Sequence, residues 1–523
     1  MIKNILEYFE KTVADKPDKV AVMDGERTIT FSALAQQALG LASCLHKSCG
    51  GKIRRPVGVF LPKSIESVVS DLGIIYAGHA YMNLDVKTPM HRIGNILNLV
   101  DPLYVITNEQ YRETLRTVWP DDKILCMDSN AAELDGSEAD RIYRNLEQII
   151  DTDPLCLINT SGSTGTPKSV VLNHRSFINY TEWAIETLKL DEKEVLGSMA
   201  PIVFDHASYE FCLMLMHGCT LAFIPESYPL FPARLMQFLV EKEITYIFWV
   251  PTIMVNIANM DLLSRFQLPS LKKICFAGEV FPTKQFNYWR RHLPAATFVN
   301  LYGPTEITVD CTYYIVEREI RDDEPIPIGY PCRNTDVLIL NAENQPAAQG
   351  EDGELCVRGT SLAMGYYNNP EKTAAAFVQN PLNTAYPELI YRTGDIVYVN
   401  SRGEIVYKGR NDSLIKHSGK RIELSEIEHV VINTLQLVKN GCVVYDYEKK
   451  EIVFYYEASE EIAVGQLRKR IGEALPKYMI PSKFVFMEQL PRNTNGKIDR
   501  LRLKEQLNEP AGTHTTNENG MFP

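Results

Sequence analysis

The sequence predicts an α/β protein: a large N-terminal domain of layered α/β subdomains plus a β-rich subdomain, then a small α+β C-terminal domain. Three observations lead to this prediction. The chain has 523 residues, which is too long for a single hydrophobic core. Short apolar runs alternate with apolar stripes at helical spacing up to about residue 330. Beyond that point short strands punctuated by glycine replace the alternation.

The first elements have the pattern of amphipathic helices. Residues 1–19 alternate apolar and charged side chains, which predicts a surface helix and lacks the long apolar run of a secretory signal. Ser32 precedes an apolar stripe at helical spacing, which predicts a helix capped by that serine. The same spacing recurs further on, at Ile65, Val68, Leu72 and Ile75.

Short apolar runs have the length and composition of buried strands. Four of them interleave with the helices, at residues 57–61, 103–106, 155–158 and 246–250. Strands that alternate with helices indicate a largely parallel sheet. The later β-rich subdomain is predicted from residues 336–340, 353–358 and 403–409.

The C-terminal part shows the order strand, helix, strand, strand, helix. Ser425 and Glu428 have the spacing of a capping box, and Val443 and Val453 lie in two strands predicted to pair. We place the domain boundary at Asp412. The predicted division is an N-terminal core at 1–411, a C-terminal domain at 412–507 and a polar, disordered tail at 508–523.

Composition excludes several classes of protein. With 54 Lys and Arg against 66 Asp and Glu, the net charge is −12, which offers no basic surface for nucleic acid or anionic membrane. The sequence contains no run of about 18 apolar residues, so no membrane span is predicted. The 11 cysteines are scattered without a CxxC pair, which predicts reduced thiols in the cytoplasm. Cys156, Cys275 and Cys442 lie in apolar runs and are predicted to be core residues.

A loop of small and hydroxylated residues follows the strand at 155–158. Glycine permits close approach of backbone N–H groups, hydroxyls donate hydrogen bonds and a lysine adds charge, which together suit a polyphosphate. A Walker loop is excluded because Pro167 stands where that motif has glycine. Taken alone, the run also fits a flexible surface turn. The residues of this predicted phosphate loop are Thr160, Ser161, Gly162, Ser163, Thr164, Gly165 and Lys168.

Seven ordered motifs resemble those of the adenylate-forming superfamily, which includes acyl-CoA synthetases, luciferases and the adenylation domains of nonribosomal peptide synthetases. The resemblance spans nearly the whole chain. The motifs are the loop at 160–168, Phe204-Asp205, Ala277-Gly278-Glu279, the segment 302–306, the segment 391–395, the segment 409–412 and Asn495-Gly496-Lys497.

The resemblance implies a nucleotide site that uses ATP and Mg²⁺. Thr305 and Glu306 match positions that contact the α-phosphate and hold the metal, and Gly278 and Glu279 match a further nucleotide-binding motif. The remaining matches are Tyr302 for stacking on adenine, Asp395 and Arg410 at the ribose, and Lys497 for bridging the substrate carboxylate and ATP. The implied first step is attack of that carboxylate on the α-phosphorus.

Asp205 matches the aspartate that pairs with the ammonium of an amino-acid substrate; a cap for the following helix is the alternative. Bulky side chains in the matching substrate pocket favour glycine, then alanine or serine. Asp310 departs from an apolar wall and leaves a small polar or basic side chain open. The other pocket positions are His206, Tyr209, Phe248, Cys275, Ala277, Leu301 and Val309.

The resemblance also implies transfer of the activated acid to a thiol after the small domain rotates. Asp412 matches the hinge, and Gly419 lies in the loop that lines the thiol tunnel. No carrier module follows Lys497, so we expect a separate phosphopantetheinylated carrier protein, as in the D-alanine ligase of teichoic acid modification and the glycine ligase of lipid A modification. The alternatives are an acyl-CoA synthetase for a small organic acid and a catalytically silent binding module.

Overall fold

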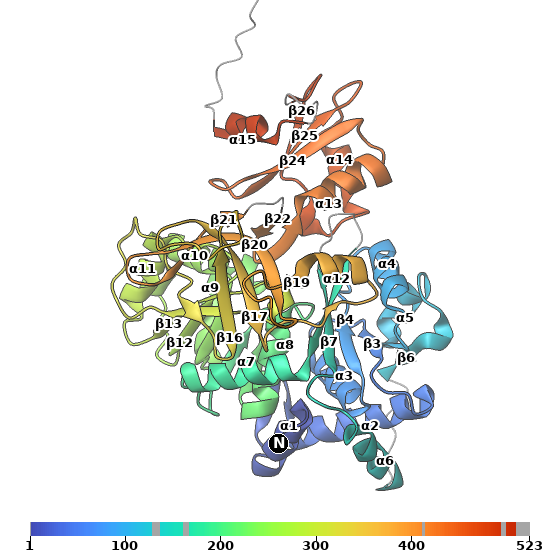
Figure 1. The fold of residues 1–523 in the computed structure, drawn as a ribbon. Coiled ribbons are helices and arrows are strands. Elements are labelled where there is room, and N and C mark those ends of the chain that lie inside the picture. Colours follow the sequence, from blue (N-terminus) through green and yellow to red (C-terminus); the bar gives the residue numbers. More distant parts are fainter. Residues whose placement is uncertain (1, 128–135, 161–166, 411–413, 493–497, 509–523) are drawn as a thin grey trace, which may run out of the picture. The chain divides into compact units, whose positions relative to one another are not determined.

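The computed structural model describes residues 2–127, 136–160, 167–410, 414–492 and 498–508. The chain divides into two compact units, of which the first ends at Arg421 and the second begins at Ile422 (Figure 1). The predicted boundary residue, Asp412, lies outside the described residues, and the predicted domain limits stay a prediction.

Two large sheets form the frame of the first unit. The seven-stranded sheet has the order β18-β8-β7-β4-β3-β5-β6, and its strands from β7 to β6 are parallel neighbours. Its strands are β3 (Pro56–Val59), β4 (Ala80–Asn83), β5 (Val105–Thr107), β6 (Ile124–Cys126), β7 (Pro154–Thr160), β8 (Lys168–Asn173) and β18 (Gly365–Tyr366). The apolar runs at 57–61, 103–106 and 155–158 therefore lie in this sheet, as predicted.

The nine-stranded sheet has the order β15-β14-β13-β12-β11-β9-β10-β1-β2. Its centre, from β13 to β1, is parallel, and antiparallel strands close both edges. Its strands are β1 (Val20–Asp24), β2 (Arg27–Thr30), β9 (Val195–Ser198), β10 (Thr220–Phe223), β11 (Tyr246–Trp249), β12 (Lys273–Phe276), β13 (Thr297–Tyr302), β14 (Thr312–Ile315) and β15 (Tyr330–Pro331).

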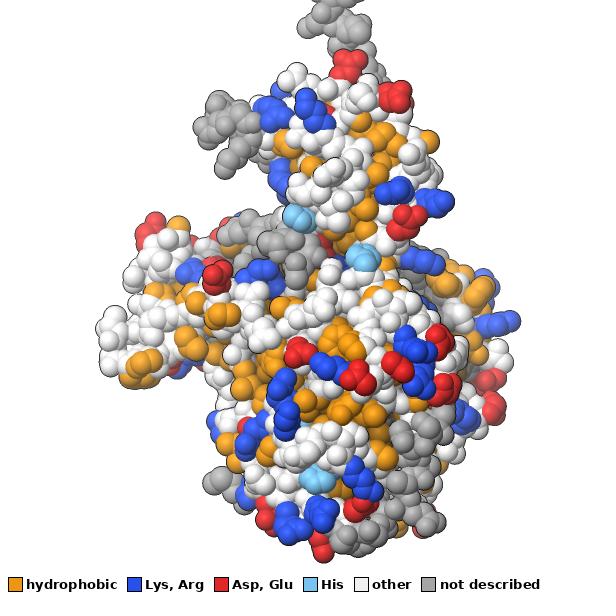
Figure 2. Space-filling model, turned by 90° about the vertical axis from the view of Figure 1, so that its right-hand side faces the viewer, with side chains coloured by type: hydrophobic (Ala, Val, Ile, Leu, Met, Phe, Trp, Pro, Cys, Tyr) orange, Lys and Arg blue, Asp and Glu red, His pale blue; other side chains and the backbone are white. Residues whose placement is uncertain are grey.

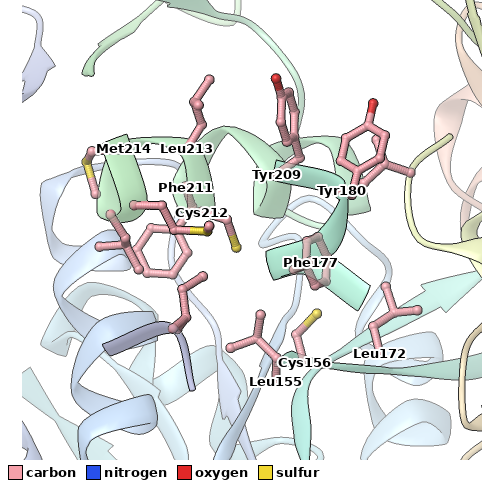
Figure 3. Close-up of a cluster of buried hydrophobic side chains, with 14 of the residues drawn as sticks. Leu155, Cys156, Leu172, Phe177, Tyr180, Tyr209, Phe211, Cys212, Leu213 and Met214 are labelled. Atoms are coloured by element: carbon pink, nitrogen blue, oxygen red, sulfur yellow. The ribbon is translucent and has the colours of Figure 1, made fainter. Parts of the chain in front are cut away.

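Helices cover both sheets, and α7 and α8 pack against each other within the core. The helices are α1 (Ile5–Asp15), α2 (Phe31–Cys49), α3 (Ile65–Tyr76), α4 (Met90–Val100), α5 (Glu109–Arg116), α6 (Gly136–Leu146), α7 (His174–Thr187), α8 (Asp205–His217), α9 (Pro232–Glu241), α10 (Pro251–Asn259), α11 (Thr283–His292) and α12 (Pro370–Ala376). The predicted helix after Ser32 exists, but it starts at Phe31, two residues earlier than a Ser32 cap predicts: the cap is Thr30, whose hydroxyl accepts from the Ala33 N–H. Figure 3 shows apolar side chains of α7, α8, β7 and β8 meeting in one buried layer.

The β-rich subdomain completes the first unit. Its five strands are β16 (Thr335–Leu340), β17 (Gly353–Gly359), β19 (Phe377–Gln379), β20 (Leu389–Val399) and β21 (Ile405–Arg410). This confirms that short strands replace the alternation of strands and helices beyond residue 330. The first unit ends inside the hairpin of β22 (Leu414–His417) and β23 (Lys420–Glu423).

The second unit is a small α+β fold. A three-stranded sheet combines an antiparallel pair with a parallel third strand, and the elements are α13 (Leu424–His429), β24 (Asn440–Asp446), β25 (Glu451–Glu457), α14 (Val464–Gly472), β26 (Lys483–Phe486) and α15 (Arg500–Asn508). The paired strands at Val443 and Val453 are confirmed. The capping box is wrong, because Ser425 lies inside α13 and the Glu428 carboxylate accepts from the Val443 N–H at 2.6 Å.

The surface and the cysteines agree with the composition. On the face shown in Figure 2, Lys and Arg side chains alternate with Asp and Glu side chains instead of gathering into a basic patch. Cys156, Cys275 and Cys442 are fully buried, and all 11 cysteines are free. Among the described residues no helix is both long and apolar enough to cross a bilayer. The mixed α/β class, with a large N-terminal and a smaller C-terminal part, is confirmed.

Candidate functional site

Tyr302, Asp395 and Arg410 meet where β13, β20 and β21 end or pair. Asp395 is 2% exposed and lies opposite Arg410 in the register of β20 and β21. One carboxylate oxygen accepts from the Tyr302 hydroxyl, and the other lies 2.7 Å from the Arg410 guanidinium. Burial, and then the charge of Asp395, raise the pKa of Tyr302 well above its usual value, so the phenol stays a donor. The structure thus brings together the three residues that the resemblance places near adenosine.

Glu306 lies on a short 3-10 turn, η5 (Thr305–Ile307), directly after β13 and is 0% exposed. Its carboxylate accepts from the Tyr366 hydroxyl at 2.8 Å and from the Arg421 guanidinium at 2.5 Å. Burial opposes ionisation, but the charge and hydrogen bond of Arg421 outweigh it and hold the pKa of Glu306 below its usual value. The site therefore contains a buried carboxylate anion whose counter-charge is a guanidinium.

Such a carboxylate fits a magnesium ion, since hard oxygen anions are its ligands in proteins. Glu306 would be the residue that holds such a metal, which when bound would add positive charge for phosphate oxygens. No group of three or more His, Cys, Asp or Glu side chains gathers as a metal cage within the described ranges. A magnesium ion held by one carboxylate and by substrate phosphates would need no such cage.

The predicted phosphate loop starts and ends on neighbouring antiparallel strands. Thr160 ends β7 and Lys168 begins β8, and the two residues are register partners. The Lys168 ammonium lies 5.2 Å from the centre of the Tyr366 ring, whose hydroxyl donates to Glu306. The structure therefore places a cation of the loop beside the Glu306 site. The loop residues Ser161, Gly162, Ser163, Thr164 and Gly165 lie outside the described residues, as do Lys497 and Asp412.

Glu279 contacts the hairpin at the end of the first unit. One carboxylate oxygen accepts from the N–H and hydroxyl of Thr252, and the other accepts from the Gly419 N–H at 3.0 Å. Gly419 has a φ of 73°, and a Cβ atom there would lie 2.3 Å from a methyl carbon of Val250. Glycine is therefore required for this approach of the hairpin to Val250, which follows β11, and to the Gly278-Glu279 turn.

The nine positions of the predicted substrate pocket lie on α8 and on, or shortly after, β11, β12 and β13, whose carboxyl ends are where parallel sheets commonly place ligands. Two rings from different elements are in contact, with the centroids of His206 and Phe248 3.9 Å apart. The positions are Asp205, His206 and Tyr209 on α8, Phe248 on β11, Cys275 and Ala277 on and after β12, and Leu301, Val309 and Asp310 on and after β13.

Asp205 and Asp310 supply the acidic groups of this cluster. Asp205 is the first residue of α8, and its carboxylate accepts from the His206 N–H at 2.9 Å; the cap position belongs to Phe204. Burial raises the pKa of Asp205, and hydrogen bonding from Thr305 opposes that effect. Asp310 is 2% exposed and accepts from the Tyr180 hydroxyl at 2.7 Å. The cap alternative for Asp205 is wrong, because the side chain lies one position inside the helix.

Four contact residues escaped the sequence analysis: Tyr180, Tyr366, Lys416 and Arg421. The Lys416 ammonium lies 5.3 Å from the centre of the Tyr302 ring, and Arg421 pairs with Glu306. Both belong to the hairpin segment in which the sequence pointed only to Gly419. Their positive charge beside apolar residues of the same segment was the signal that could have identified them. Tyr180 and Tyr366 stand in ordinary helix and strand patterns that carry no such signal.

Comparison with known proteins shows the family of the chain. The family model described as AMP-binding enzyme matches residues 9–367. The chain is 31% identical to Zwittermicin A synthase ZmaJ of Bacillus cereus, covering 98% of this chain and 97% of that protein. It is 32% identical to Delta-poly-L-ornithine synthetase of Acinetobacter baumannii over 96% of this chain, but it spans only 36% of that protein. It likewise spans less than half of Tyrocidine synthase 1 of Brevibacillus parabrevis, to which it is 31% identical over 96% of its own length.

A solved structure shares the fold. The Vibrio cholerae adenylation domain AlmE, in complex with glycyl-adenosine-5′-phosphate, superposes with a TM-score of 0.82 at 21% identity, covering 97% of this chain and 98% of that one. At this identity the likeness shows the fold alone. Because the family model matches well over half of the chain and the match to ZmaJ runs nearly end to end, the chain belongs to the AMP-binding enzyme family of adenylate-forming ligases.

Proposed function

We propose that the protein uses ATP and Mg²⁺ to activate a small amino acid as its aminoacyl adenylate and then transfers it to the thiol of a separate carrier protein. The observation that carries this proposal is the buried Glu306 anion, which faces Arg421 and lies one aromatic ring away from Lys168. A reaction that brings a carboxylate to a phosphate needs cations from several directions to offset the repulsion between the two anions.

In the proposed adenylation step each end of ATP has its own group of side chains. Asp395, held by Tyr302 and Arg410, would accept hydrogen bonds from the ribose hydroxyls. Thr160 and Lys168 would contact phosphate oxygens. Glu306 would hold magnesium, which when bound neutralises phosphate charge. Lys497, which lies outside the described residues, is proposed to bring the substrate carboxylate and the α-phosphate together. Preorganised charges of this kind contribute on the order of 100- to 1000-fold each.

The amino group of the substrate would pair with Asp205. A partly buried carboxylate is costly without a cation, so a substrate that brings an ammonium is favoured over a simple organic acid. Several large side chains leave little room for the substrate's own side chain, since Tyr209, Phe248 and Leu301 are all buried. Size alone ranks glycine first, then alanine and serine.

The transfer step is proposed to require movement of a C-terminal domain at 412–507 about Asp412, with 508–523 as a tail. Relatives named as synthases and a solved adenylation–carrier di-domain support a carrier protein as the acceptor. An acyl-CoA synthetase is the second candidate, because a solved CoA synthetase shares the fold with a TM-score of 0.80. Free cysteines throughout the described residues support a reducing compartment, the cytoplasm.

The test measures two reactions separately. ATP–pyrophosphate exchange is measured with each common amino acid and with the des-amino analogues acetate and propionate. Loading is then measured with a phosphopantetheinylated carrier protein and with free coenzyme A. Exchange that depends on an amino acid, followed by loading of the carrier, supports the proposal. Exchange with the des-amino acids and transfer to free coenzyme A would instead favour the acyl-CoA synthetase.

A further inference from the structure

A cavity lies inside the first unit, between α3, β4, α8 and β10. None of the nine positions of the predicted substrate pocket, all of them described by the structure, belongs to its lining. Figure 3 shows the side chains of Phe211, which lines the cavity, and of Tyr209, a substrate-pocket position, leaving α8 on opposite sides. The cavity is therefore separate from the site described above. Its lining includes Asp71 on α3, Asn83 on β4, Ser208 and Phe211 on α8, and Phe223 on β10.

The acid of this cavity belongs to the buried part of a helix. Every residue of α3 from Ser67 to Tyr76 is buried, and Asp71, which is 5% exposed, is the only charged side chain among them. A surface helix turns its charged residues to water, whereas α3 turns this one inward. An acid in such a position is costly unless a cation or several donors serve it.

Asp71 has one donor and no counter-charge among the described residues. The Asn83 amide donates to its Oδ2 at 2.9 Å, and its Oδ1 is buried without a hydrogen-bond partner. Burial, opposed only by the bond from Asn83, raises the pKa of Asp71 to about 8. After burial, the charge of Asp71 also helps to raise the pKa values of Tyr81 on β4 and Cys156 on β7, and both of these neighbours are uncharged. The carboxylate therefore lacks a positive partner.

Two further oxygen atoms of the cavity lack partners. Because the NH₂ group of Asn83 donates to Asp71, its Oδ1 is the atom that remains, and that atom is buried without a hydrogen bond. The Ser208 hydroxyl is likewise buried and without a partner among the described residues. Three elements, α3, β4 and α8, thus supply one carboxylate oxygen and two neutral oxygens to the same cavity. Oxygen atoms of these kinds are the ligands of hard cations.

Lys63 also lines the cavity, but other acceptors hold its ammonium. It donates to the Ser198 hydroxyl at 2.7 Å and to the Ala200 carbonyl at 2.8 Å, and it lies 4.9 Å from the centre of the Phe223 ring. Burial lowers its pKa to about 8, and the acid that opposes this shift is Glu210. A second cation of charge two is unfavourable in a cavity that already contains an ammonium and only one unpaired carboxylate.

We propose that the oxygen atoms of Asp71, Asn83 and Ser208 hold a monovalent metal cation, such as potassium or sodium, inside this cavity. Its single charge would balance the single carboxylate, and the three unpartnered oxygens would replace part of its water shell. The ion would join α3, β4 and α8, so its role is to stabilise the first unit and not to take part in the proposed reaction. The lining residues that are partly exposed, and therefore mark the entrance, are Lys63, Ile202 and Ala207.

The experiment compares urea unfolding in potassium chloride, sodium chloride and tetramethylammonium chloride at equal ionic strength. The measurement is made at about pH 8, near the pKa of the cation-free acid. Tetramethylammonium controls for ionic strength, because its methyl groups keep the oxygens from reaching the charge. We expect potassium or sodium to lower the unfolding equilibrium constant progressively, by about 10-fold at ten times the dissociation constant. Equal unfolding in all three salts would mean that the cavity holds only water, and it refutes the proposal.

Two variants connect the salt dependence to the cavity. Asp71→Asn removes the charge with little change of shape and is expected to abolish the difference between the salts. Asp446→Asn is the matched control, because Asp446 is also 5% exposed but already accepts from the N–H groups of Glu448 and Lys449. This variant should retain the difference between the salts. A difference that survives Asp71→Asn, or that disappears equally in Asp446→Asn, contradicts the assignment.

A second measurement on the native protein locates the ion and decides the matter should Asp71→Asn not fold. Thallium(I) replaces monovalent cations in proteins and scatters X-rays anomalously, so crystals of the native protein are soaked in a thallium(I) salt. An anomalous peak within bonding distance of Asp71, Asn83 and Ser208 is the expected result. A cavity without such a peak, in crystals that show thallium elsewhere, overturns the proposal.

Discussion

Replacing Gly419 by alanine should detach the hairpin of β22 and β23 from the turn that carries Glu279. The added Cβ would lie 2.3 Å from one methyl carbon of Val250 and 3.1 Å from its Cβ. The residue would also keep a φ of 73°, which alanine adopts only with strain. The substitution therefore combines a steric clash with backbone strain at one position.

The magnitudes of these two effects can be separated. Backbone strain costs about 1–3 kcal/mol and a buried overlap about 1–3 kcal/mol. The bond from the Gly419 N–H to the Glu279 carboxylate, 3.0 Å long, contributes about 1.5–3 kcal/mol. The two costs together come to about 2–6 kcal/mol, which is comparable to or larger than the contribution of this bond, so the docked hairpin loses most or all of its advantage over the detached one.

A matched control removes the strain from the comparison. Gly403 has a φ of 78°, but a Cβ there would meet nothing within 4 Å. Gly403→Ala therefore carries the backbone strain without the clash. Val250→Ala shortens the side chain that the new Cβ would strike, so the double variant with Gly419→Ala should regain docking.

Hydrogen exchange of the amide at position 419 measures docking directly, because that N–H is bonded to Glu279 only in the docked state. We expect Gly419→Ala to raise its exchange rate about 30-fold or more, the equivalent of about 2 kcal/mol or more. Gly403→Ala should leave it unchanged, and the double variant should restore protection. Equal protection in Gly419→Ala and the native protein, or no rescue by Val250→Ala, would refute the steric reasoning.

Four further outcomes are expected. Burial raises the pKa of Asp71 to about 8, so this acid lowers the free energy of unfolding increasingly as pH rises from about 4 to 8. In Asp71→Asn the decline of the free energy of unfolding with pH, measured from urea unfolding curves, should be smaller. An unaltered pH dependence in the variant contradicts this expectation. Arg421→Ala leaves Glu306 buried without its cation, which should cost about 3–5 kcal/mol and turn its lowered pKa into a raised one. In the native protein the lowered pKa of Glu306 contributes stability that is present at neutral pH and is lost on acidification. In the variant, where the pKa of Glu306 is expected to be raised, the stability of the protein should instead fall as pH rises, as followed by thermal melts from about pH 4 to 9. Lys497→Ala should abolish ATP–pyrophosphate exchange while ATP still binds in calorimetry, and near-normal exchange would remove the lysine from the proposed mechanism. Asp412→Pro should spare exchange and block carrier loading, so an equal loss of both speaks against a hinge at that residue.

Local pattern was enough to locate many individual elements. The apolar runs now in β3, β5, β7 and β11 were recognisable because a strand buried on both faces has no polar alternation. Caps were less predictable. Thr30 and Ser32 are both hydroxylated residues close to the start of α2, and the choice between them depends on where the preceding strand β2 ends. Similarly, Glu428 takes no part in a capping box, because its carboxylate accepts a hydrogen bond from a backbone N–H of β24 instead.

The order of strands was beyond local pattern. In the seven-stranded sheet β4 lies between β7 and β3, and β18 joins the edge from far along the chain. Nothing in the composition of β18, a two-residue strand, marks it as a partner of β8. Pairing of this kind is decided by which edges remain open once the larger elements have packed, and that depends on the whole chain.

From the sequence alone the kind of chemistry could be predicted: a glycine-rich loop and a series of ordered motifs indicated a nucleotide site, and an acid at the start of α8 led to the proposal of an amino-acid substrate. Only the tertiary structure decided which charges meet. Arg421 reaches Glu306 across 115 positions, and Tyr180 reaches Asp310 across 130. These partners matter because burial makes each carboxylate depend on a donor or cation close by, and sequence spacing does not reveal which residue the fold will bring there.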